Sequence, residues 1–220
     1  MVELDRIFRR YYRKDFVKFE KTEIVERLVN KDKSLLIRGN NKIFLINIEV
    51  NGNCKYDIFV ENNIDEKIVI VILVNIKENS QFDIDIKFKA FGEVYFYLEI
   101  IHNSDSFSNV NIKGYIRGNV VILSKMVIPK ESSNANTNLN EIFYINDGKI
   151  VTIPSLLVYN PTGKGSHASK IIKISEEEKF YLRSKGISDK EISKIIEESM
   201  FIKTSSNNSL WVKKGKKLKI

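Results

Sequence analysis

Strict alternation of apolar and polar residues marks the middle of the chain. From Phe82 to Phe88, phenylalanine and isoleucine alternate with aspartate and lysine, so one face of the segment is apolar and the other is charged. A period of two residues is typical of a β-strand with one buried face. Similar segments, separated by turns rich in Asn and Gly, predict about ten short strands with no helix between them. The clearest are residues 43–48, 56–60, 67–76, 82–88, 94–100, 109–116, 120–128, 141–145 and 149–158.

Two architectures fit consecutive strands without intervening helices. The first is an antiparallel β-sandwich, which the pair Asp147-Gly148 favours because Asp-Gly is a common hairpin turn. The second is a β-solenoid, whose stacked coils suit strand-and-turn units spaced by roughly 20 residues. The period alone does not decide between them.

The start of the chain has a helical period instead. Apolar residues recur at steps of three and four residues, which places them on one stripe of a helix, and a second short helix is expected over residues 22–28. Packing of this stripe on the main body is the favoured interpretation, and binding of a partner is the alternative. The residues of the stripe are Leu4, Ile7, Phe8, Tyr11 and Tyr12.

Two capping boxes predict a helical hairpin near the C-terminus. Ser175 and Glu178 form the first box, Ser188 and Glu191 form the second, and Gly186 can end the helix between them with a positive φ. The expected organisation is therefore an N-terminal helical arm over 1–33, a β core over 34–174, the hairpin over 175–203 and a basic tail over 204–220.

Composition narrows the function classes only slightly. The net charge of +8 is concentrated in clusters at 6–14 and 213–219, and basic termini are usually solvated, so a nucleic-acid role is disfavoured. The longest apolar run, 68–74, is too short to span a membrane. No apolar leader is visible at the N-terminus, and the single cysteine excludes an intramolecular disulfide, so we expect a cytoplasmic protein.

Few residues are candidates for chemistry. His167 stands among Gly, Ser and Ala residues in an expected loop, where an accessible imidazole could bind a metal or transfer a proton, or simply hydrogen-bond a backbone carbonyl. His102, at a strand end, is expected to be a packed or edge histidine rather than a ligand. Cys54, in a predicted turn, is expected to be an incidental thiol. Asp83 and Asp85 share a face with lysines, which favours a solvated surface over a glycosidase site.

Three motifs follow one another between residues 153 and 201. A strand contains Pro154 and Leu156, a loop reads Ser166-His167-Ala168, and a helix reads Phe180-Tyr181-Leu182-Arg183-Ser184-Lys185-Gly186-Ile187. This order resembles the C-terminal part of the SufB/SufD family of iron–sulfur cluster assembly scaffolds. The resemblance covers roughly residues 110–201. It implies a right-handed parallel β-helix core, of roughly six coils at the spacing above.

The resemblance also implies a function. It implies a scaffold subunit without catalytic residues, which pairs with SufB or with itself and recruits a SufC-type ATPase. No cofactor would be held stably by this chain alone, and iron or an iron–sulfur cluster would pass transiently through a subunit interface near His167. The family's docking helix places ATPase contacts on Phe180, Tyr181, Leu182, Arg183, Gly186 and Ile187. The alternatives are a divergent structural module without assembly activity and a basic nucleic-acid-binding protein.

Several positions depart from the family pattern. Leu157 stands where relatives have a glutamate, and Pro161-Thr162 replaces an acidic pair before the histidine. The late cysteine and the glutamate beside the histidine that are typical of SufB are absent. The chain is also about half the usual length. It is therefore interpreted as a short, SufD-like member.

Overall fold

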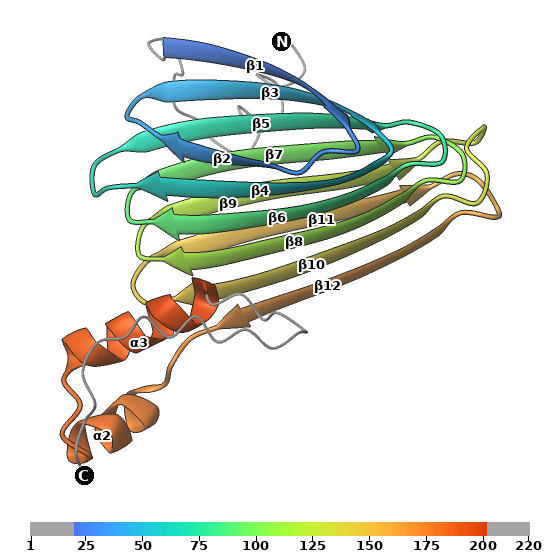
Figure 1. The fold of residues 1–220 in the computed structure, drawn as a ribbon. Helices are drawn as coiled ribbons and strands as arrows, with labels where there is room; N and C mark the ends of the chain where they lie inside the picture. The colour runs from blue at the N-terminus through green and yellow to red at the C-terminus, as the bar shows by residue number, and fades with distance from the viewer. Residues whose placement is uncertain (1–19, 202–220) are drawn as a thin grey trace.

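The computed structural model describes residues 20–201, in which two six-stranded parallel sheets face each other (Figure 1). We call them the odd sheet and the even sheet after their strand numbers. The odd sheet contains, in spatial order, β1 (Glu20–Val29), β3 (Lys42–Asn51), β5 (Lys67–Ile76), β7 (Glu93–His102), β9 (Asn119–Ile128) and β11 (Lys149–Val158). The even sheet contains β2 (Lys33–Arg38), β4 (Asn53–Asn62), β6 (Gln81–Ala90), β8 (Phe107–Ile116), β10 (Asn136–Ile145) and β12 (Lys164–Ile172).

Each coil contributes one strand to each sheet, so the fold is a parallel β-solenoid of about six turns. In the middle coils, Lys67 pairs with Glu93 and Glu93 pairs with Asn119, which is a repeat of 26 residues. The predicted β-helix is confirmed. The sandwich alternative is wrong, because the strand pairs throughout the two described sheets are parallel.

The hairpin that Asp147-Gly148 indicated is not formed. These residues make a corner of the solenoid, where the chain passes from β10 of the even sheet to β11 of the odd sheet. Gly148 lies in a column of glycines with Gly118 and Gly92. A Cβ added to Gly118 would lie 1.9 Å from the carbonyl oxygen of Gly92. Successive coils therefore stack backbone on backbone at this corner, which only glycine permits.

The predicted alternation explains the core. In β6 the side chains of Phe82, Ile84, Ile86 and Phe88 are fully buried between the sheets, while the intervening residues face outward. Because the coils are in register, each inward residue stacks on its equivalent above and below, and apolar area is removed from water along the whole stack.

The prediction of a helix at 22–28 is wrong, since these residues lie in β1. Thr22, Ile24 and Leu28 sit on the inward face of β1, with Leu28 buried, and β1 pairs in parallel with β3 over its whole length. Pairing with an existing sheet overrides a weak local helical pattern. The solenoid thus begins before residue 34. The predicted arm over 1–19 and the basic tail over 204–220 lie outside the described residues.

The helical hairpin is confirmed as α2 (Glu176–Ser184) and α3 (Asp189–Phe201), with both capping boxes formed. Gly186 has φ +80°. The amides of Gly186 and Ile187 bond back to Arg183 and Leu182, which is a Schellman end.

The second helix of the hairpin, α3, lies against the outer face of the even sheet. The ring of Phe201 makes an edge contact with Phe59 at 5.6 Å between centroids, and Glu197 forms an ion pair of 2.6 Å with Lys89. Beneath the helices, Tyr115 and Tyr144 stack on each other and are buried although they face outward.

Candidate functional site

The interior of the solenoid changes character at its last coils. In one inward column of the even sheet, four aligned residues are apolar and the fifth is a carboxylate: Leu35, Ile58, Ile86, Ile112 and then Glu141. An acidic residue in this column has to be stabilised by hydrogen bonds, because burying an unpaired charge is costly.

Glu141 receives those hydrogen bonds from the opposite sheet. Ser124 of β9 donates to one carboxylate oxygen at 2.8 Å, and Thr152 of β11 donates to the other at 2.7 Å. Both hydroxyl residues also occupy columns that are apolar in the preceding coils, where Leu98 pairs with Ser124 and Ile122 pairs with Thr152. The carboxylate bridges the two sheets, and its side chain is fully inaccessible.

His167 lies directly beyond this carboxylate. It is in the middle of β12, in register with Leu139, and its Nε2 atom is 3.8 Å from the nearer oxygen of Glu141. Its side chain keeps 30% of its accessible surface, because β12 belongs to the last coil and no described coil covers it. Glu141 and His167 therefore form a pair with one buried member and one member at the open end.

The predicted loop around His167 is wrong, since residues 164–172 form β12. Gly165, Ser166 and Ala168 are weak strand formers, and pairing with β10 holds them extended. Ser124, Glu141 and Thr152 were not predicted as site residues from the sequence. The sequence did carry a signal for Glu141. It lies two residues from Leu139 and two from Phe143, so the alternation of the strand places it on the same inward face.

The pair offers two ligands of the kind that iron and zinc accept, an imidazole nitrogen and a carboxylate oxygen. A separation of 3.8 Å is too long for a direct hydrogen bond between them. Residues 20–201 contain no group of three or more His, Cys, Asp or Glu side chains suited to hold a metal ion. Further ligands for a metal here would have to come from outside the described part of the chain.

Both sheets end at this coil with an open edge. Within residues 20–201, β11 and β12 are each paired on one side only. The nine residues of β12 are almost all exposed. An unpaired edge presents backbone N–H and C=O groups that can pair with a strand of another chain.

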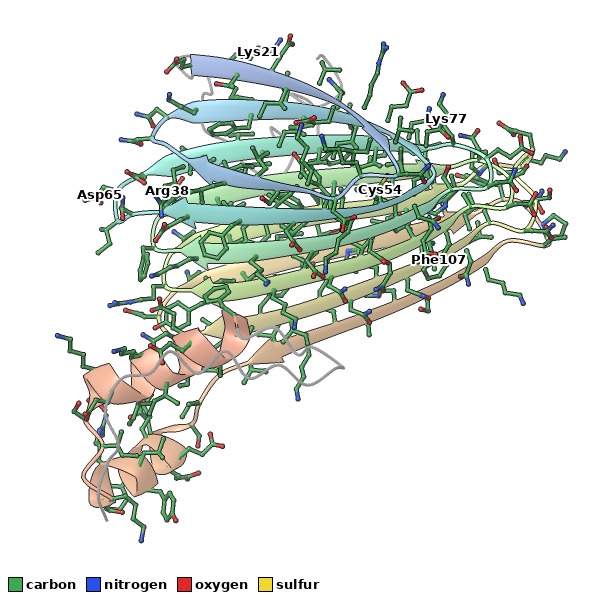
Figure 2. All side chains as sticks on the ribbon, viewed as in Figure 1. Lys21, Arg38, Cys54, Asp65, Lys77 and Phe107 are labelled. Atoms are coloured by element: carbon green, nitrogen blue, oxygen red, sulfur yellow. The ribbon has the colours of Figure 1, made fainter. Side chains whose placement is uncertain are left out.

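The other candidate residues lie elsewhere. Cys54 is in β4 and faces the core, near the β1 end of the stack and far from β12, so its predicted turn is wrong (Figure 2). His102 is fully buried and packed, as predicted. Its two ring nitrogens are each 2.9 Å from a serine hydroxyl, Ser106 and Ser108. Burial lowers the pKa of His102 to about 4, so the ring is neutral.

The six predicted docking residues divide into two groups. Phe180 and Tyr181 expose 71% and 61% of their surface on α2. The others shape the hairpin: Arg183 makes a two-pronged ion pair with Asp189, Gly186 forms the turn, and Leu182 and Ile187 are half-buried. Two adjacent exposed aromatic residues are unusual on a solvated helix and are typical of interaction sites.

Comparison with known proteins agrees with the motifs. Residues 94–200 match the family model described as SUF system FeS cluster assembly, SufBD core domain. The matched region contains the last coils, the Glu141–His167 pair and both helices. It thus supports the SufB/SufD resemblance that the motifs between 153 and 201 indicate.

Curated relatives carry the same description. An iron-sulfur cluster assembly SufBD family protein of Staphylococcus epidermidis is 26% identical over 193 residues, and one of Staphylococcus haemolyticus is equally similar. A third, from Staphylococcus saprophyticus, is 29% identical over 103 residues. The first match covers 79% of this chain and 40% of the relative, so the chain spans less than half the length of these relatives. Between residues 20 and 201, neither helix has the length and apolar character needed to cross a bilayer.

Proposed function

We propose that this chain is a SufD-like scaffold subunit for iron–sulfur cluster assembly. The observation that carries the proposal is the position of Glu141 and His167 at the open end of the solenoid, inside the region that matches the SufBD core model. Iron or a nascent cluster is the cargo of this site, and the chain performs no catalysis of its own.

The open end suits a shared site. The chain supplies one imidazole and one carboxylate, and a four-coordinate metal needs more ligands. A second subunit paired along β11 or β12 would bring its own side chains next to Glu141 and His167. The site would then lie at the seam between the two subunits. The partner is a SufB-type subunit or a second copy of this chain, and the Glu141–His167 pair is what this chain contributes to the shared site.

The hairpin suits recruitment of a SufC-type ATPase. Phe180 and Tyr181 form the exposed apolar tip of α2, while the Arg183–Asp189 ion pair joins α2 to α3. Because α3 is anchored to the even sheet through Phe201 and Glu197, a force applied to the hairpin by the ATPase reaches the solenoid. The ATPase would thereby alter the seam between subunits.

Substitution of His167 tests the cargo site. The chain is reconstituted with a SufB-type subunit, a SufC-type ATPase, iron, a sulfide source and ATP, and cluster formation is followed by absorbance. His167→Ala should lower cluster formation by about tenfold or more, as expected for loss of a metal ligand or its support. The matched control is Lys170→Ala, because Lys170 is exposed on the same strand. Equal cluster formation by both variants would refute the role of His167.

Substitution on α2 tests the docking site. The double variant Phe180→Ala/Tyr181→Ala should weaken binding of the ATPase by at least about tenfold, measured by calorimetry, because exposed aromatic anchors dominate such interfaces. Lys194→Ala on α3, where Lys194 is also highly exposed, is the control. Unchanged affinity of the double variant would show that the ATPase binds elsewhere or not at all.

A further inference from the structure

A network of four buried polar side chains lies inside the solenoid, beside the corner that follows β7. We call it the His102 network: Ser106, His102, Ser108 and Thr137. Each of the four keeps at most 2% of its accessible surface. A hydroxyl has a single hydrogen to donate, and a neutral imidazole has a single N–H. The direction of every bond in the network therefore follows once one end is fixed.

A backbone carbonyl fixes that end. Ser106 Oγ lies 2.6 Å from the carbonyl oxygen of Asn103, which can only accept, so Ser106 donates its hydrogen there. Ser106 must then accept from the ring of His102, and the donor is Nδ1–H at 2.9 Å. Nε2 of the neutral ring carries no hydrogen and accepts from Ser108 at 2.9 Å, and Ser108 accepts from Thr137 at 2.8 Å. His102 is therefore held as the Nδ1–H tautomer.

A second proton on the ring has no place in this arrangement. An Nε2–H group would have to donate to Ser108, which would turn its own hydrogen toward Thr137. The hydroxyl hydrogen of Thr137 would then need a new acceptor, and the next residue in its column is Gly165, which has no side chain. A buried network that is only partly satisfied is costly.

The surroundings of the ring are neutral as well. Its register partner in β5 is Ile76, β9 ends beside it in Val127 and Ile128, and β8 and β10 face it with the hydroxyls of the network. The charged residues of the adjoining corners are exposed or partly exposed: Lys77, Glu78, Asp105, Lys130 and Glu131. Within residues 20–201, burial is the one cause that shifts the pKa of the ring, which it lowers to about 4. A buried imidazolium would have no counter-charge, which favours an open network once the ring is protonated.

Two corners of the solenoid join the core at this histidine. We call them the β7 corner, residues 103–106, and the β9 corner, residues 129–135. Ser132 of the β9 corner donates to the backbone carbonyl of His102 at 2.8 Å. The amide of Asp105 in the β7 corner donates to a carbonyl of the β9 corner, also at 2.8 Å. Both corners therefore depend on the position of the end of β7.

We propose that the His102 network is an acid-sensitive latch on the β7 and β9 corners. Uptake of one proton from solvent at Nε2 breaks the bond from Ser108 and opens both corners, while the central strands stay paired. The amide of Lys164 donates to the carbonyl of Ala135 in the β9 corner at 2.9 Å, so the opening reaches the start of β12. The latch does not depend on cluster assembly and stands or falls separately from it.

Nuclear magnetic resonance of the full chain tests the deduced directions. With ¹⁵N-labelled histidine near pH 7.5, long-range proton–nitrogen correlations should show His102 in the Nδ1–H form; its signal is the one missing from His102→Gln. Ser106→Ala removes the acceptor that fixes the direction and should shift the ring toward the Nε2–H form. Thr137→Val removes the far hydroxyl, keeps the shape of the side chain and should leave the tautomer unchanged. A ring protonated on Nε2 in the unsubstituted protein overturns the proposal.

Hydrogen exchange tests the latch itself. The protection factors of the Asp105 and Lys164 amides should fall at least about tenfold between pH 7 and pH 5. The amides of β6, which is paired on both sides, should stay better protected than these two at both pH values. In His102→Gln the two corner amides should keep the same protection at pH 7 and pH 5.

Two results of the exchange experiment would overturn the proposal. The first is unchanged protection of the corner amides in the unsubstituted protein. The second is equal protection of the corners and of β6 at pH 5, because the proton would then unfold the whole chain instead of opening the corners.

Discussion

The middle coils and the last coils share a backbone but differ in one inward column of the even sheet, which is apolar in the middle and carries a carboxylate near the end of the stack. In the middle coils, aligned inward positions hold Ile58, Ile86 and Ile112, each almost fully buried. In the last coils, the same column holds Glu141, its hydroxyl donors Ser124 and Thr152 lie opposite on the odd sheet, and His167 lies at the open end. The carboxylate is tolerated there because Ser124 and Thr152 donate hydrogen bonds to it, so the solenoid can hold a polar side chain beside its open end.

The largest expected effect comes from moving the carboxylate into the middle. Ile112→Glu places a charge one coil above Glu141, at a column position that is apolar in the preceding coils, and should cost at least about 4 kcal/mol of unfolding free energy. Chemical denaturation measures it. Ile112→Val is the control, with an expected loss of about 1 kcal/mol. Similar denaturation midpoints for the two variants would show that a buried carboxylate is tolerated at position 112 as it is at position 141.

The buried ring of His102 should make the stability of the protein depend on pH. Burial lowers the folded-state pKa of His102 to about 4. As the pH falls, His102 therefore binds a proton near pH 6.5 in the unfolded chain but only near pH 4 in the folded chain. The contribution of His102 to the free energy of unfolding is complete above pH 6.5, and it falls by up to ~3 kcal/mol as the pH drops to 4. Thermal or urea unfolding across this range measures the slope.

Substitution assigns that slope to one histidine. His102→Gln should remove it, because glutamine does not titrate and can still bond Ser106 or Ser108. His167→Ala should leave the slope in place, since it leaves the His102 ring and its contacts with Ser106 and Ser108 intact. A slope that survives His102→Gln would contradict the assignment to the buried ring.

A smaller effect is expected from the hydroxyls around Glu141. Ser124→Ala removes one of the two bonds to the carboxylate and should cost about 1–2 kcal/mol, because Thr152 still donates to the other oxygen. Denaturation midpoints give the difference. A loss as large as that of Ile112→Glu would mean that the coil of Glu141 tolerates an unpaired polar group no better than the middle coils do.

The smallest effect is expected on the outer face of the last coil. Ser166→Ala removes an exposed bond to Asn138 and should change stability by no more than about 0.5 kcal/mol. It should also leave cluster formation unchanged, in contrast to His167→Ala one residue away. Loss of cluster formation in Ser166→Ala would move the functional face from the interior side of β12 to its outer side.

The sequence by itself determined the strands and the caps. The strands 67–76 and 149–158 were predicted at the residues where they occur, because a period of two is a local property of the chain. The same holds for the boxes at Ser175 and Ser188, where side chain and backbone lie within four residues of each other. Such signals need no knowledge of the rest of the fold.

Tertiary structure alone decided how those strands pair and what they bring together. Asp147-Gly148 by itself indicated a hairpin. In the folded chain Gly148 stacks on Gly118 at a corner of the solenoid, so the chain crosses there from one sheet to the other. Residues 22–28 and 164–172 are extended because neighbouring strands offer them backbone partners. Ser124, Glu141, Thr152 and His167 come from four strands spread over 44 residues of sequence, and only the 26- to 30-residue coil length brings them to one place.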